Sequence, residues 1–100
     1  MIYVADNGPL RTITLARPDK ANALTRQMLA DIGAAFAPPP AIRCVVLTAQ
    51  GTVFSAGADL DAARAGLATD TIWAEVSNRI AALPCLTIAA LNGTVAGGAF

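Results

Sequence analysis

The chain has 100 residues, of which 55% are hydrophobic and 14% charged, and its seven basic residues balance seven acidic ones. This length supports one small domain with one core, and a charged share below the usual level of about 25% predicts faces that other protein covers. No block of lysines and arginines exists, which excludes an electrostatic nucleic-acid or anionic-membrane surface.

The absence of histidine excludes Ser-His and Cys-His catalytic pairs and histidine metal sites within this chain, and no metal is expected. Cys44 and Cys85 each begin an apolar run, which predicts buried free thiols. The first residues, Met1–Asp6, lack the basic and apolar regions of a secretion signal. No apolar run reaches membrane-spanning length, so a cytoplasmic location is expected.

The chain begins with a predicted β-hairpin. Two short β-branched segments, Ile2–Ala5 and Leu10–Leu15, flank the turn-forming residues Asp6–Pro9. The segment Arg17–Lys20 contains a proline and interrupts the second strand.

An amphipathic helix is predicted next, over Arg26–Ala37, because its apolar residues recur at helical spacing. Thr25 is a good N-cap, and Pro38–Pro40 cannot continue an α-helix. The nearly unbroken apolar run Ile42–Thr48 then predicts a strand covered on both faces, as in a parallel sheet.

The most informative stretch is Thr52–Leu60, which predicts a tight turn that leads from a strand into a helix start at Asp59–Arg64. The small residues Ser55–Ala58 leave backbone N–H groups open to a ligand, and a helix start adds partial positive charge. The turn is therefore interpreted as an anion or oxyanion site. Close packing is the alternative explanation for small residues at such a turn.

The last third predicts one more helix and one more strand. The helix is capped by Thr69 or Asp70, ends at Pro84, and contains Ile72, Val76, Ile80 and Leu83. A buried strand is expected over Leu86–Leu91, followed by a second small-residue turn over Val95–Phe100.

The two turns suggest one binding pocket. A buried strand is expected before each of the glycine-bearing pairs, Gly57-Ala58 and Gly97-Gly98. The carboxyl ends of neighbouring parallel strands meet at one edge of a sheet, where ligands bind. We therefore expect both turns to face the same pocket.

Four segments, in this order and spacing, resemble the crotonase superfamily, the enoyl-CoA hydratase/isomerase family. They are Arg17–Leu24 (RPDKANAL), Arg43–Thr48 (RCVVLT), Phe54–Leu60 (FSAGADL) and Pro84–Gly98, with NGTVAGG at its end. The resemblance covers nearly all of the chain. It implies an α/β fold of the crotonase-like ββα superhelix (spiral) type, truncated. Residues 1–100 would be the N-terminal part of the domain, without the C-terminal half and the trimerisation helices.

The resemblance also implies the chemistry. Family members bind a coenzyme A thioester and stabilise its enolate with two backbone amides, which correspond here to Ala58 and Gly98. The residues expected to bind the substrate are Ala56, Ala58, Asp59, Leu60 and Gly98. No separate cofactor is expected, because coenzyme A is part of the substrate. A homo-oligomer, a trimer or hexamer, is implied for the full-length form.

The expected activity is hydration of a 2-enoyl-CoA in fatty acid metabolism by a lyase, or isomerisation through the same oxyanion hole. In hydratases of the family the acid/base glutamates lie beyond the position of Phe100, so this chain alone is expected to be inactive. A non-catalytic acyl-CoA-binding or interaction fragment of the same fold is the alternative. A serine peptidase is excluded because no histidine base accompanies Ser55.

Several residues keep two interpretations at this stage. Asp59 is either a helix N-cap or shapes the turn. Lys20 and Arg26 either contact a coenzyme phosphate or are solvated surface charges. Trp73 either lines the acyl pocket as a lid or packs against its neighbours.

Overall fold

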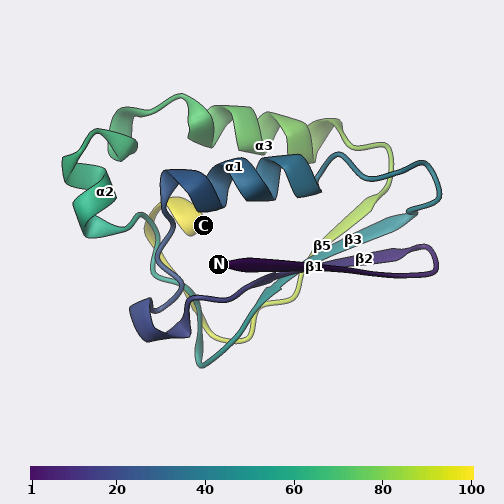
Figure 1. Ribbon diagram of the computed structural model, residues 1–100, viewed down its shortest axis with the longest axis horizontal. Helices are drawn as coiled ribbons and strands as arrows, with labels where there is room; N and C mark the ends of the chain where they lie inside the picture. Colours follow the sequence, from purple (N-terminus) through teal and green to yellow (C-terminus); the bar gives the residue numbers. More distant parts are fainter.

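The computed structural model describes all of residues 1–100. A four-stranded sheet has the order β1-β2-β3-β5, formed by Ile2–Asn7, Leu10–Leu15, Cys44–Ala49 and Leu86–Ala89. The first two strands form the expected antiparallel hairpin, and β2, β3 and β5 are parallel. Helices α1 (Arg26–Ala35) and α3 (Ile72–Ala82) lie side by side over one face of the sheet (Figure 1).

A second, smaller sheet pairs β4 (Val53–Ser55) with β6 (Thr94–Val95) in parallel. A single parallel bridge between Leu24 and Ala58 lies beside it. The chain thus visits the large sheet, then the small sheet or its bridge, then the helical layer, before returning for the next strand. This is the expected ββα spiral. Helix α2 (Leu60–Arg64) and three 3-10 turns, Pro18–Lys20, Leu67–Thr69 and Gly97–Ala99, complete the chain.

The core lies between the sheet and the two long helices. It consists of 14 buried apolar residues, including Ile13, Leu15, Met28, Leu29, Ile32 and Val45. The buried residues of α1, and Ile72 and Val76 of α3, pack in this core with residues of β2 and β3. Burying these residues is what fixes the helices over the sheet.

Helix α1 begins as predicted, because the Thr25 Oγ1 accepts the Met28 N–H at 3.1 Å. It ends at Ala35 rather than at the expected Ala37. A proline disfavours helical geometry in the residue before it, and Pro38 therefore acts on Ala37 before the proline run itself begins. The N-cap of α3 is Thr71 rather than the expected Thr69 or Asp70, and the Asp70 Oδ1 accepts the Ile72 N–H at 2.9 Å from one residue further back.

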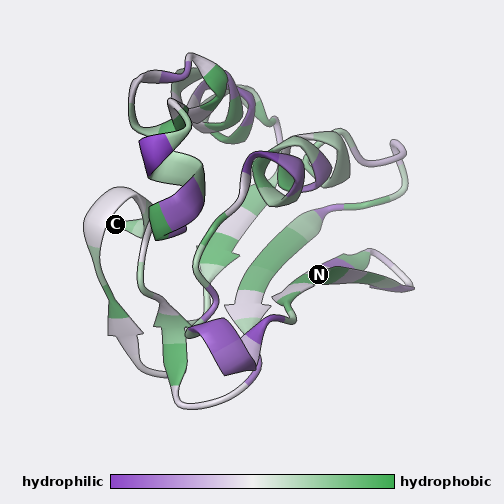
Figure 2. Ribbon diagram, turned by 60° about the vertical axis from the view of Figure 1, so that its left-hand side comes forward, coloured by the Kyte–Doolittle hydropathy of each residue, from purple (hydrophilic) through white to green (hydrophobic).

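The strands are less buried than predicted. Leu86–Leu91 was expected to be buried, but Leu86, Ile88 and Leu91 are 63%, 44% and 58% exposed. The expectation that Ile42–Thr48 is covered on both faces is also wrong for this chain, which places helices on only one face (Figure 2). Both thiols are free, but Cys44 and Cys85 are half-buried rather than buried.

The position of the glycine-bearing turns also differs from the prediction. They follow β4 and β6 of the small sheet, and not directly the large-sheet strands β3 and β5. The chain reverses at Gln50-Gly51 and again at Asn92-Gly93, which gives each unit a second, short strand. None of the helices has both the length and the apolar character required to cross a lipid bilayer.

Candidate anion site at two glycine-bearing turns

The first turn leaves one backbone amide without an internal partner. After β4, the Ala56 N–H donates to the Ala21 carbonyl at 3.0 Å, and the Gly57 N–H donates to the Ser55 Oγ at 3.1 Å. The Asp59 N–H donates to the Leu24 carbonyl at 2.8 Å. The Ala58 N–H donates to no internal acceptor, and it is therefore the one amide of this turn that is available to a ligand.

The direction of the Ala58 N–H is fixed by the residue before it. The Gly57 carbonyl accepts the Leu24 N–H at 2.7 Å. In a planar trans peptide the carbonyl of one residue and the N–H of the next point in opposite directions. The Ala58 N–H therefore points away from the Leu24 backbone.

The second turn has two amides without an internal acceptor, those of Gly97 and Gly98. The Ala96 N–H donates to the Ser55 carbonyl at 3.1 Å, which continues the pairing of the small sheet. The N–H groups of Ala99 and Phe100 close the 3-10 turn at Gly97–Ala99. The Gly98 N–H has no internal acceptor, and Gly98 is exposed.

The two turns are in direct contact. Gly57 has a φ of +96°, and a Cβ built on it would lie 2.9 Å from the Ala96 carbonyl oxygen. Gly97 has a φ of +56° and would place a Cβ 3.5 Å from the Gly57 Cα. At Gly57, only glycine permits both this backbone conformation and this approach.

One hollow of about 530 Å³ is lined by both Ala58 and Gly98, with Thr69, Asp70, Trp73 and Ser77 around them. The prediction that the two turns face one pocket is therefore confirmed. A second hollow of about 470 Å³ is lined by Ala56, Ala58, Asp59, Leu60, Lys20 and Arg64, together with Ala23 and Asp61. Ala58 belongs to both hollows.

Asp59 caps α2 and also clamps the turn, so both of its interpretations are correct. Its Oδ2 accepts the Ala62 N–H at 3.1 Å, and its Oδ1 accepts from the Arg17 guanidinium at 3.0 Å. The same guanidinium nitrogen donates to the Ala23 carbonyl at 3.0 Å. The Ala62 N–H, and next the Arg17 guanidinium, lower the pKa of Asp59 below its ordinary value. Asp59 is thus a carboxylate that supports the turn.

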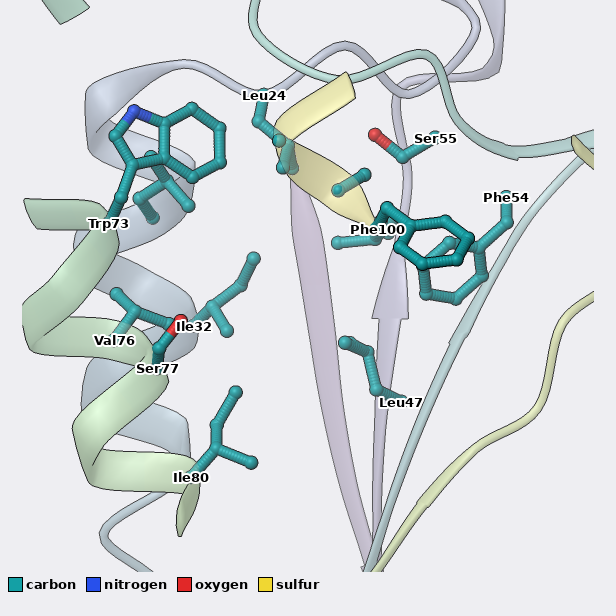
Figure 3. A pocket seen from close by; sticks show the side chains of 14 residues that line it. Leu24, Ile32, Leu47, Phe54, Ser55, Trp73, Val76, Ser77, Ile80 and Phe100 are labelled. Atoms are coloured by element: carbon teal, nitrogen blue, oxygen red, sulfur yellow. The ribbon is translucent and has the colours of Figure 1, made fainter. Parts of the chain in front are cut away.

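Trp73 lies against the second turn. A Cβ on Gly98 would meet the indole ring at 2.9 Å, and the indole Nε1 donates to the Leu67 carbonyl at 2.9 Å. Trp73 also borders an apolar cavity of about 200 Å³, together with Ile32, Leu47, Phe54, Val76, Ile80 and Phe100 (Figure 3). It both packs and lines the hollow.

Asp70 is the only carboxylate in the hollow that Ala58 and Gly98 share. Its Oδ1 accepts the Ile72 N–H at 2.9 Å, and its Oδ2 accepts the Arg26 Nε at 2.9 Å. The Ile72 N–H, and next the Arg26 guanidinium, lower the pKa of Asp70. Asp70 therefore stays ionised near neutral pH and is occupied by internal donors. Arg26 is paired with it at the surface, which favours the surface-charge interpretation of Arg26.

Sequence reasoning gave Asn22 no role of its own. Its side chain is fully buried, accepts the Arg17 N–H at 2.9 Å, and donates to the carbonyls of Gln50 and Val53 at 2.8 and 2.9 Å. A polar residue between Ala21 and Ala23 in an otherwise apolar run was the available signal. The buried asparagine holds the start of β4, and therefore the first turn, in place.

Comparisons with known proteins show the family and the fold of the chain. Residues 6–100 match the profile of a family described as enoyl-CoA hydratase/isomerase. The chain is 40% identical over 104 residues to the mevalonyl-coenzyme A hydratase of Beauveria bassiana, which covers 86% of the chain. It is 37% identical over 107 residues to the carnitinyl-CoA dehydratase of Salmonella enteritidis, which covers 99% of it.

A solved structure shows the same fold. The enoyl-CoA hydratase subunit I of Geobacillus kaustophilus superposes with a TM-score of 0.84 at 37% identity, over 98% of this chain. The chain spans only part of each of these proteins, namely 36% of the first, 41% of the second and 40% of the solved structure.

Proposed function

The chain belongs to the enoyl-CoA hydratase/isomerase family, the crotonase superfamily, and from that premise we propose that it carries the enolate-binding half of an acyl-CoA active site. The Ala58 and Gly98 amides donate to the thioester oxygen of the substrate. The observation that carries the proposal is that these two amides have no internal acceptors and line one hollow.

Negative charge develops on the thioester oxygen when the substrate becomes an enolate, and fixed backbone donors stabilise that charge without having to reorganise. The Gly57–Ala58 peptide is held by the Leu24 N–H before any ligand arrives. Loss of one such donor typically lowers the rate by about 10²–10³-fold.

The two hollows suggest the path of the substrate. Ala58 lies between the hollow that contains Lys20 and Arg64 and the hollow that contains Trp73 and Gly98. A thioester bound at Ala58 would place the coenzyme along Ala56, Asp59 and Leu60, beside Lys20 and beside Arg64, which also pairs with Asp61 at 3.7 Å. The acyl group would then extend toward Trp73. Substrate-binding roles for Ala56, Ala58, Asp59, Leu60 and Gly98 follow from this path.

Hydration also needs an acid and a base, which add the elements of water at C3 and C2 of the enoyl group. Asp70 does not suit either role, because both its oxygens accept hydrogen bonds and its pKa is lowered. We propose that residues outside this chain supply both groups. The chain alone would then bind acyl-CoA without hydrating it, and a homo-oligomer of the complete protein remains a prediction.

The test is hydration of crotonyl-CoA, followed by the loss of the absorbance of its conjugated thioester. The complete polypeptide from the native source should hydrate it, and the 100-residue chain should bind it without turnover. Replacing Ala58 by proline removes the N–H, and the rate should fall by about 10²–10³-fold. Ala58→Gly retains the N–H and should lower the rate much less. Equal rates for the two variants would contradict the proposal.

A further inference from the structure

We propose that the buried hydroxyl of Ser55 is a positioning residue, which orients the Ala58 amide toward the bound thioester oxygen. The inference rests on the function proposed above. The role of Ser55 differs from that of the Ala58 and Gly98 amides, because Ser55 does not touch the substrate. Ser55 acts through the backbone of Gly57.

The hydroxyl makes two hydrogen bonds in a site that is closed to solvent. The Ser55 side chain is fully buried. Its Oγ donates to the Asn22 carbonyl at 2.8 Å and accepts the Gly57 N–H at 3.1 Å. A hydroxyl has one donor, and both neighbours are backbone groups of fixed polarity, so the direction of each bond is determined.

Asn22, whose carbonyl accepts the Ser55 hydroxyl, is held firmly in the core. Asn22 is held by the Arg17 N–H on one side and by the Gln50 and Val53 carbonyls on the other. The backbone of Asn22 has a φ of +52°, a left-handed conformation that non-glycine residues rarely adopt. The hydroxyl therefore links the first turn to a fixed point in the core.

The Ser55 hydroxyl gives two successive amides different roles. The Ser55 hydroxyl draws the Gly57 N–H into the protein, whereas the Ala58 N–H stays open. Without the hydroxyl, a buried N–H and a buried carbonyl would both lose their partner, which the backbone can relieve only by rotating. Rotation of the Ala56–Gly57 peptide would change the φ of Gly57, move the Gly57–Ala58 peptide away from its bond with the Leu24 N–H, and turn the Ala58 N–H out of line with Gly98.

The experiment compares two ligands in binding titrations with the protein. Butyryl-CoA offers a neutral thioester oxygen, and acetoacetyl-CoA forms an enolate whose charge lies on oxygen. The wild type should bind acetoacetyl-CoA more tightly and show the absorbance of the bound enolate. Ser55→Ala should lower that preference by about tenfold or more, because small misplacements of a catalytic group are costly. Its affinity for butyryl-CoA should change much less.

Val45→Ala is the matched control, because it truncates a fully buried residue of β3 that makes no contact with the turn's hydrogen bonds. It should lower stability and keep the preference for the enolate. Should Ser55→Ala fail to fold, Ser55→Cys provides the same test with a weaker donor and acceptor in the same place, and an intermediate preference is expected.

The outcomes separate the two claims. A wild type without any preference for the enolate would overturn the proposed function itself. A wild type with the preference and an unchanged Ser55 variant would overturn only the role of Ser55. Loss of the preference in both Ser55→Ala and Val45→Ala would mean that the effect comes from lower stability, and would also overturn the role of Ser55.

Discussion

The two glycine-bearing turns have similar sequences, Ser55-Ala-Gly-Ala58 and Val95-Ala-Gly-Gly98, but different physical supports. Polar contacts from Asn22, Leu24 and Arg17 hold the first turn. The second turn has one backbone bond to Ser55 and otherwise rests on shape, between Gly57 and the Trp73 ring. Precise placement of an open amide is thus achieved once by hydrogen bonds and once by close packing.

The change with the largest expected effect is Gly57→Ala, because it damages both turns at once. The new methyl group would require a strained φ and would approach the Ala96 carbonyl to 2.9 Å. We expect a loss of about 2–5 kcal/mol in the free energy of unfolding, measured by urea denaturation. Gly8→Ala is the control, since Gly8 has a φ of +58° with open space around it. It should cost only about 1–2 kcal/mol, and equal costs would contradict the close contact of the turns.

Trp73→Ala should disturb the second turn alone. It removes the ring that lies on Gly98 and leaves a cavity, at an expected cost of about 2–3 kcal/mol because Trp73 is only partly buried. Trp73→Phe keeps an aromatic ring but loses the bond to the Leu67 carbonyl and part of the indole that lies on Gly98, at about 1–2 kcal/mol. Amide spectra should show shifts at Gly98 and little change at Ala58. Shifts of the same size at both turns would mean that they are not supported separately.

Asp59→Asn should disturb the first turn, and its effect should depend on pH. The folded pKa of Asp59 is lowered from 3.8, so the carboxylate stabilises the folded state above pH 3.8 and loses this effect as the pH falls through the folded pKa. Asparagine still caps the helix but loses the charge opposite Arg17. The difference in unfolding free energy between wild type and variant should therefore shrink on acidification. A difference that grows at low pH would contradict this role.

Lys20→Ala should have the smallest effect and should leave both turns intact. Lys20 lines the hollow that also contains Arg64, where the proposed path places the coenzyme phosphates. The affinity for an acyl-CoA should fall a few-fold at low salt, and the difference should disappear at high ionic strength, where exposed charges are screened. A salt-independent difference would argue against a role in attracting the coenzyme.

Much of the fold was predictable from local patterns in the sequence. The hairpin turn, the Thr25 cap and the spacing of apolar residues in α1 and α3 are short-range signals, and the structure confirms them. The end of α1 was missed because a proline acts on the residue before it. The exposure of Leu86 and Ile88 was missed because hydropathy alone does not tell which neighbour covers a strand.

The position of the site was predictable from the sequence, but the contacts that hold its two turns in place were not. The small residues around Gly57 and Gly98 indicated two open turns, and the structure brings them into one hollow. The contacts of Asn22 with Gln50, Val53 and Ser55 join residues about 30 positions apart in the chain. Such long-range bonds leave no periodic signal in a single sequence. The pairing of Arg26 with Asp70 is hidden for the same reason.

The most direct test of the central claim is a titration of the ¹⁵N-labelled protein with acetoacetyl-CoA, followed by ¹H–¹⁵N spectra. We expect the Ala58 and Gly98 amide signals to shift together, and further than those of Ala56 and Ala99, whose N–H groups have internal acceptors. A ligand that binds while either Ala58 or Gly98 stays unshifted would contradict the claim that the two turns form one anion site.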